Sequence, residues 1–135
     1  MIRTRITFNG DPAMREIRAR SWNGLRRATL FFWQQLQLAL NIPNPGVRVR
    51  RGRRTRTIYP SPSQPGEPPR KRTGFGQRNV IYRLDQTRMM SKVGIMGNAP
   101  YMAYLELGTR RVRARPWLLA TLMRFRAQIK TLLES

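Results

Sequence analysis

With 135 residues, the sequence is long enough for one domain, and its 27 Lys+Arg against 6 Asp+Glu give a net charge of +21. It contains no cysteine and no histidine, which excludes disulfides, thiol nucleophiles, Cys/His zinc sites and imidazole bases. So much positive charge repels itself in a compact state, so a polyanion or an acidic partner is expected nearby. The most apolar window, residues 30–40, is too short and too polar to span a bilayer, and we expect no membrane partner.

The N-terminal part predicts a strand followed by a long helix. Residues 2–8 alternate apolar and polar side chains, as in a strand with one buried face. Asp11 can then cap a helix whose first position is Pro12. This helix should continue to about Leu40, because Asn41 and the prolines that follow stop it.

One stripe of this helix is apolar, comprising Met14, Ile17, Leu25, Ala28, Phe32, Leu36 and Ala39. Trp22, Phe31 and Trp33 fall outside the stripe. Either the helix is wedged between two layers of its own domain, or the additional aromatic face packs on a neighbouring copy. We favour the second interpretation, because the chain has only one other substantial helix, and we take these three residues as candidate subunit-interface residues.

Residues 46–59 predict a two-stranded arm with a tight turn at Arg51-Gly52, because β-formers alternate with arginines on both sides of it. One face of this arm should be almost wholly arginine. A solvated hairpin is the plainer interpretation, but six arginines among residues 48–56, with no acid, favour a phosphate-facing role. The candidates for contact with DNA or an acidic partner are Arg48, Arg50, Arg51, Arg53, Arg54 and Arg56.

Residues 60–69 contain five prolines, which excludes a helix and predicts polyproline II or irregular chain. The cluster Arg70, Lys71 and Arg72 follows and is a second candidate for the same anionic partner. A flexible surface loop and a contact segment ordered in an assembly are equally compatible with this composition.

Two β-rich segments, residues 79–84 and 89–96, predict a hairpin with a four-residue loop. A C-terminal amphipathic helix is predicted from the spacing of Leu118, Leu122, Phe125, Ile129 and Leu132. The expected architecture is a single α+β domain over residues 1–135. In it, a long N-terminal helix and a C-terminal helix pack on a small, mostly antiparallel sheet of three to five strands.

Between these elements, residues 98–118 predict a short helix, a stop, a basic loop and the start of the next helix. Asn98 can cap a helix with Pro100 in its first turn. Its apolar face comprises Tyr101, Tyr104 and Leu105. Gly108 occupies the position of a left-handed C-terminal cap, and Thr109 leads the chain away. Pro116 is expected at the first position of the next helix.

The loop between the two helices carries Arg110, Arg111 and Arg113, which are candidate subunit-interface residues. Glu106 is the only acid in this stretch. A general-base role would need a second carboxylate or a metal cluster, and the sequence supplies neither here. We therefore expect Glu106 to pair with Arg110, Arg113 or Arg115, and we expect no enzymatic activity, metal or cofactor.

Three pieces of this stretch, residues 99–101, 104–109 and 114–118, together resemble the signature of a bacteriophage tail-component family. Its members are small head–tail joining, or tail-completion, proteins of phages with long non-contractile tails. Residues 65–74 and 92–95 resemble further elements of that family in the same order. The structural motif of the resemblance comprises Pro100, Tyr101, Tyr104, Leu105, Glu106, Gly108, Thr109, Arg115, Pro116 and Trp117.

The resemblance implies a structural protein of the virion neck, assembled in the host cytoplasm. Copies would form a ring, six-fold in our expectation, between the head connector and the tail tube or tail terminator. Double-stranded DNA would pass through without sequence readout. The arginine hairpin (46–59) and the proline-rich basic loop (60–72) look like insertions relative to the family. We expect the hairpin arginines to face the lumen and residues 110–115 to contact another subunit.

Composition alone favours a different class, a sequence-nonspecific nucleic-acid-binding protein of ribosomal or nucleoid type. No helix-turn-helix, zinc finger or ribonucleoprotein aromatic pair is present in the sequence. The arginines are not interleaved with aromatic residues, so attraction to phosphate without base readout is the expected mode.

Overall fold

A computed structural model describes residues 10–60 and 62–135, so the strand predicted over residues 2–8 lies outside the described residues. The predicted α+β class is confirmed. The elements, in chain order, are α1 (Asp11–Ala39), β1 (Val47–Arg51), β2 (Arg54–Ile58), α2 (Phe75–Arg78), β3 (Val80–Asp85), β4 (Met90–Ile95), α3 (Tyr101–Leu107), α4 (Leu119–Arg124) and α5 (Arg126–Glu134).

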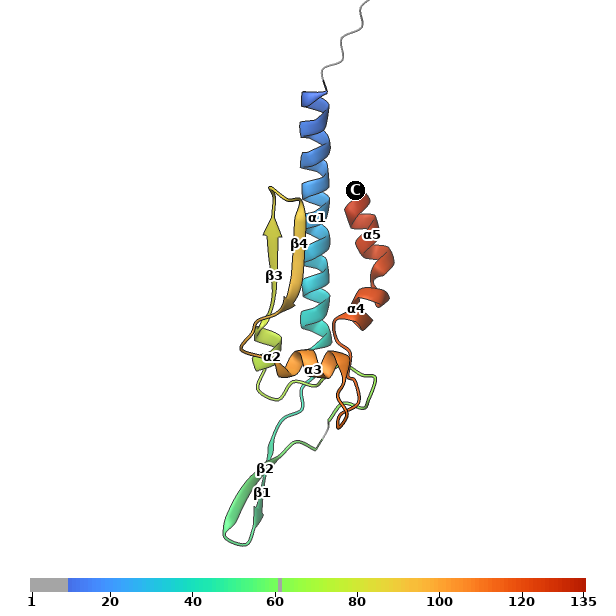
Figure 1. Ribbon diagram of the computed structural model, residues 1–135. Helices are drawn as coiled ribbons and strands as arrows, with labels where there is room; N and C mark the ends of the chain where they lie inside the picture. The colour runs from blue at the N-terminus through green and yellow to red at the C-terminus, as the bar shows by residue number, and fades with distance from the viewer. Residues whose placement is uncertain (1–9, 61) are drawn as a thin grey trace, which may run out of the picture.

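Helix α1 is the middle layer of the domain. The β3–β4 hairpin lies along one side of it, and α4 and α5 lie along the other (Figure 1). Gly24 and Ala28 are buried, which lets the backbone of α5 approach α1 closely. The domain thus supplies a layer for each side of α1, as in the interpretation that we did not favour.

The start of α1 differs from the sequence prediction. Residues 11–20 are exposed and extend beyond the other elements (Figure 1), so Met14 and Ile17, expected in the apolar stripe, are each 56% exposed. They lack a partner layer because α5 and the β3–β4 hairpin are shorter than α1. Gly10, not Asp11, is the N-cap residue. Asp11 lies in the first turn instead, where a carboxylate interacts favourably with the helix dipole.

The β3–β4 hairpin has a four-residue loop, as predicted, but the loop is residues 86–89, one residue later than expected, because Asp85 pairs with Met90. The antiparallel register also pairs Val80 with Ile95 and Tyr82 with Val93. Its inner face packs on α1 through Tyr82, whose ring lies edge-on to Trp33 at 5.5 Å. The Trp33 indole N–H also donates to the carbonyl of Val80 at 3.0 Å. Strand and helix are therefore joined by both ring packing and a hydrogen bond.

The single sheet of three to five strands is wrong for the described residues, which contain two separate two-stranded sheets. The β1–β2 hairpin joins no other strand, because both of its faces carry arginine and neither can be buried against the body.

The C-terminal helix is also divided, contrary to the prediction of one helix from Pro116. Helices α4 and α5 meet at Phe125, whose backbone leaves the helical region (φ −106°, ψ 14°). The Phe125 ring packs edge-on against Phe31 of α1 at 5.7 Å. Both helices pack on α1 and not on the sheet, since the sheet occupies the opposite side.

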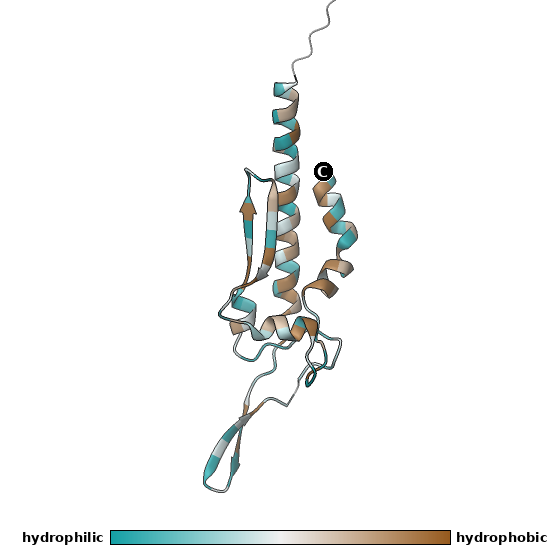
Figure 2. Ribbon diagram, viewed as in Figure 1, coloured by the Kyte–Doolittle hydropathy of each residue, from teal (hydrophilic) through white to brown (hydrophobic). Residues whose placement is uncertain are grey.

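The core lies at the end of α1 that is nearest α3, and Figure 2 shows hydrophobic residues gathered there while the β1–β2 hairpin is mostly hydrophilic. Its buried members are Leu36, Leu40, Val80, Ala99, Met102 and Trp117. Side chains also tie α1 to α2, because Gln37 and Gln77 each donate to the other's backbone carbonyl, at 3.1 and 3.0 Å.

We predict that Gly24→Ala destabilises the domain, although alanine is the better helix former by about 1 kcal/mol. An added Cβ would lie 2.8 Å from the carbonyl oxygen of Leu133 and 3.0 Å from that of Leu132, so the α5 backbone would have to move. The free energy of unfolding in urea should fall by about 1–3 kcal/mol. Asn23→Ala, at the exposed neighbouring position, should be neutral or slightly stabilising. A more stable Gly24→Ala protein would mean that α5 is not held against α1.

Candidate functional site

The β1–β2 hairpin projects from the end of the body opposite to the start of α1 (Figure 1). Its turn lies at Gly52-Arg53, one residue later than predicted, because Arg51 pairs directly with Arg54. Gly52, the first turn residue, has φ +63°. Arg53, the second, does not have a positive φ, since Met89 is the only non-glycine with positive φ among residues 10–60 and 62–135. A positive φ at the first position alone is typical of a type II′ turn, which matches the twist of paired strands.

The register places arginines on both faces of this hairpin, which corrects the prediction of a single arginine face. Directly paired residues share a face. One face carries Arg48 and Arg50 opposite threonines, and the other carries Arg51, Arg54 and Arg56 together with Val47, Val49 and Ile58. Arg53 lies in the turn, and all six arginines are exposed. The hairpin therefore presents positive charge on both faces and at its tip.

The proline-rich segment is held by backbone hydrogen bonds within the chain, and its contact with another subunit stays a prediction. The N–H of Gly66 donates to the carbonyl of Ala114 at 3.0 Å, and that of Lys71 donates to Ile42 at 2.7 Å. The N–H of Asn44 donates in turn to the carbonyl of Lys71 at 2.7 Å. These bonds fix residues 62–72 against both the end of α1 and the basic loop.

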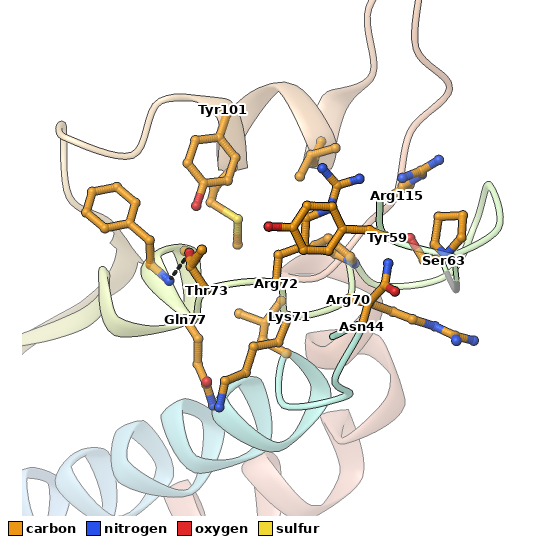
Figure 3. A pocket seen from close by; sticks show the side chains of 18 residues that line it. Asn44, Tyr59, Ser63, Arg70, Lys71, Arg72, Thr73, Gln77, Tyr101 and Arg115 are labelled. Carbon is orange, nitrogen blue, oxygen red and sulfur yellow. Dashed lines mark hydrogen bonds between the residues drawn. The ribbon is translucent and has the colours of Figure 1, made fainter. Parts of the chain in front are cut away.

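The basic cluster at residues 70–72 lies at the base of the hairpin and borders a pocket (Figure 3). The guanidinium of Arg72 lies over the ring of Tyr59, the residue after β2, at 4.5 Å. The ammonium of Lys71 donates to Asn41 at 3.2 Å, and Arg70 has a carboxylate oxygen of Glu67 at 4.0 Å. The cluster is therefore held by the body and does not extend the arginine arm.

Glu106 makes no ion pair with a described arginine, so the predicted pairing with Arg110, Arg113 or Arg115 is wrong. Its carboxylate accepts three backbone N–H bonds, from Trp117 (2.7 Å), Leu118 (2.9 Å) and Leu119 (2.9 Å). These are N–H groups at the start of α4, which have no partner within the helix. A carboxylate at a helix N-terminus is stabilised by charge-assisted bonds and by the helix dipole. Helix α4 accordingly begins at Leu119, three residues after the predicted Pro116.

The short helix of the motif starts later and faces differently from the prediction. Pro100, not Asn98, is its N-cap residue, and Tyr101 is its first residue. Met102 is the buried side chain, whereas Tyr101 and Tyr104 are 42% and 61% exposed. The Met102 side chain packs in the core with Trp117, and the carbonyl of Met102 accepts a 2.9 Å bond from the Trp117 indole N–H.

The end of this helix agrees in part with the prediction. Gly108 has φ +75°, but its ψ of 166° lies outside the left-handed helical region, so it is not a left-handed helical cap. A side chain there would meet the backbone of Ala114 at 3.0 Å. Thr109 does more than lead the chain away, since its hydroxyl oxygen accepts N–H bonds from Arg111 (3.3 Å) and Val112 (3.1 Å). This folds the basic loop into a compact turn.

The proposed subunit-interface residues have different surroundings. Phe31 and Trp33 are half-buried and have aromatic partners within the chain, and Trp22 is also half-buried. The arginines of the basic loop, Arg110, Arg111 and Arg113, are exposed. Contact of any of these residues with another copy stays a prediction.

Sequence reasoning missed several residues that build the pocket beside the hairpin. Asn44 and Ser63 are 1% and 3% exposed, although both come from proline-rich chain. Helix α2 was also missed, because its four residues are too few for a periodic pattern. The Pro-Asn-Pro run at 43–45 could have indicated an ordered Asn44.

Within residues 10–60 and 62–135, no group of three or more acids could hold a metal ion, and no helix is long and apolar enough to cross a membrane. Comparison with protein-family models, with curated proteins and with solved structures gives no significant match to this chain.

We predict that Glu106→Gln lowers the free energy of unfolding by about 1–3 kcal/mol, because the neutral amide offers one acceptor oxygen and turns its NH₂ toward an N–H. Urea denaturation monitored by tryptophan fluorescence measures this change. Glu134→Gln is the matched control, since Glu134 makes only an exposed 4.0 Å pair with Lys130. It should change the stability by less than about 0.5 kcal/mol. Equal effects of the two substitutions would contradict the capping role.

Proposed function

We propose that this protein is a structural component of a tailed-phage neck, forming a ring that joins the head connector to the tail and surrounds the passage for DNA. The observation that most supports contact with DNA is the β1–β2 hairpin. It extends away from the body and has exposed arginines on both faces and in its turn. The resemblance of residues 99–118 to the tail-component signature supports the location.

Exposed apolar side chains support assembly into an oligomer. Leu107 is 82% exposed and Tyr104 is 61% exposed on α3, near the base of the hairpin. Met14 and Ile17 are exposed near the opposite end of the body. Surfaces of this kind commonly mark protein–protein contacts. Two different patches on one chain suit a head-to-tail interface, which closes into a ring when the rotation between copies allows it.

The charge of the chain suits a channel around DNA. Each copy has a net charge of +21, and a ring adds the fields of all its copies around one axis. Arginines without aromatic neighbours attract phosphates of any sequence through counterion release. A passage that must admit a whole genome needs such sequence-independent contacts.

The second candidate function is a monomeric, sequence-nonspecific nucleic-acid-binding protein. The same hairpin supports it, because phosphate contact does not require a ring. The two candidates differ in the state of the protein without DNA.

The oligomeric state of the purified chain, at moderate salt and without nucleic acid, tests the proposal. Light scattering after size-exclusion chromatography should give one defined mass above the 15.8 kDa monomer. Negative-stain electron microscopy should show closed rings with a central opening. A chain that stays monomeric at all concentrations, yet binds duplex DNA, would instead support the second candidate.

Neutralising the hairpin should weaken DNA binding through phosphate contacts alone. We predict that Arg50→Gln/Arg53→Gln/Arg54→Gln reduces the slope of log affinity against log salt by about 0.9 for each lost contact. Fluorescence anisotropy with a labelled duplex measures the slope. The control is Arg110→Gln/Arg111→Gln/Arg113→Gln, with the same change in charge, which should keep the slope and weaken assembly. Equal losses of slope would show that total charge, and not the hairpin, sets the affinity.

A further inference from the structure

A pocket of about 420 Å³ opens at the junction of the hairpin base, the proline-rich segment, α2 and α3 (Figure 3). Its lining includes four cationic residues, Arg70, Lys71, Arg72 and Arg115, and no acidic residue. Only Arg70 has a described carboxylate within ion-pair distance. The pocket therefore has more positive charge than its own walls neutralise.

Two hydrogen-bonding atoms beside this pocket have no partner. In the described part of the chain, the buried side-chain polar atoms that lack a hydrogen bond are the hydroxyl of Ser63 and the Nε of Arg115. Both residues line this one pocket and lie on the same side of it (Figure 3). A buried donor without an acceptor is costly, and each case in a folded protein calls for an explanation.

Apolar and aromatic side chains make up another part of the lining. They include Tyr59, Phe75, Tyr101, Met102 and Leu105. The rings of Phe75 and Tyr101 are stacked with centroids 6.4 Å apart. A ligand that fits both parts of the lining has a short hydrocarbon stem and an anionic end, as pockets generally combine apolar lining with a few placed polar groups.

The walls are held in place without a ligand. The Arg115 N–H donates to the carbonyl of Leu105 at 2.7 Å, and the loop beside Ser63 is tied to Ala114 through Gly66. Gly76 of α2 approaches α3 so closely that an added Cβ would lie 2.7 Å from the sulfur of Met102. Binding therefore needs rotations of side chains and no refolding of the backbone.

We propose that this pocket binds the carboxylate of an acidic side chain from a neighbouring protein subunit. The carboxylate accepts hydrogen bonds from the Nε–H of Arg115 and the hydroxyl of Ser63, and the nearby Arg72 and Lys71 neutralise its charge. The stem of the acidic side chain lies against the aromatic wall. This role requires a protein partner, but it does not require that partner to belong to a phage neck, and it does not involve DNA.

The pocket suits a carboxylate better than a phosphate of duplex DNA. Phosphates of a duplex are spread over a broad convex surface, whereas Ser63 is almost fully buried and the donors lie behind other side chains. A single flexible side chain can enter such a site. The hairpin, with its exposed arginines, is the surface that matches a duplex.

The probe for this proposal is N-acetyl-glutamic acid α-amide, titrated into the full chain by calorimetry at constant ionic strength. The glutamine analogue is its neutral, isosteric control. We expect the glutamate compound to bind saturably and the glutamine compound to bind at least tenfold more weakly, because hydrogen bonds to a charged group are the stronger ones. Absence of binding, or equal binding of the two compounds, would overturn the proposal and leave solvent as the partner of the buried donors.

Two variants locate the binding. Arg115→Lys removes the Nε–H and keeps the charge, and Ser63→Ala removes only the hydroxyl, so that one mild variant remains if the other fails to fold. Each should weaken the glutamate compound by about tenfold. Arg113→Lys, on the exposed loop outside the pocket, should leave it unchanged. An equal loss in the control, or tighter binding of inorganic phosphate than of the glutamate compound, would refute the carboxylate site.

Discussion

The geometry of residues 98–118 depends on the hydrogen bonds that the carboxylate of Glu106 accepts. By accepting the N–H groups of residues 117–119, it fixes where α4 begins. The same contact places Trp117 against the carbonyl of Met102 and thus connects α3 to the core. These bonds join the end of α3 to the start of α4, and the longest of them in sequence spans thirteen residues. Because both of its ends are held in this way, the basic loop between the two helices is closed.

This unit also positions the pocket. Arg115 precedes Trp117 by two residues, so its backbone is fixed between Leu105 and the start of α4. The proline-rich segment is then held through Ala114, and Tyr59 at the hairpin base closes the remaining side. The hairpin is thus attached to a junction held by hydrogen bonds and extends away from the body (Figure 1). Its exposed arginines can therefore contact an external partner without disturbing the core.

The sequence predicted the elements whose signals are local. The long helix, the β3–β4 hairpin and the arginine hairpin all follow from periodicity and turn residues, and the α+β class follows from their order.

The errors come from interactions between distant residues. The sequence offered arginines beside Glu106, but backbone N–H groups eleven to thirteen residues away are its partners. The alternation of arginine and β-formers suggested one basic face. The face on which each residue lies depends on the register across the turn, and the turn is at Gly52-Arg53, one residue later than predicted. Ser63 carries no signal at all, since its burial depends on contacts between chain segments far apart in sequence.

The distribution of the acids explains why the positive charge needs an external partner. Three of the six acids, Glu16, Asp85 and Glu134, make exposed pairs with cations three or four residues away, and such pairs contribute little to stability. Glu67 lies beside Arg70 in the same way, Asp11 lies in the first turn of α1, and Glu106 caps α4. No acid of the chain therefore lies within ion-pair distance of the described hairpin arginines or of Arg110, Arg111 and Arg113. Two separate surfaces, one an extended arm and the other a compact loop, remain for anions that other molecules supply. An arm with charge on both faces suits a polyanion, whereas a loop beside exposed Leu107 and Tyr104 suits a protein surface.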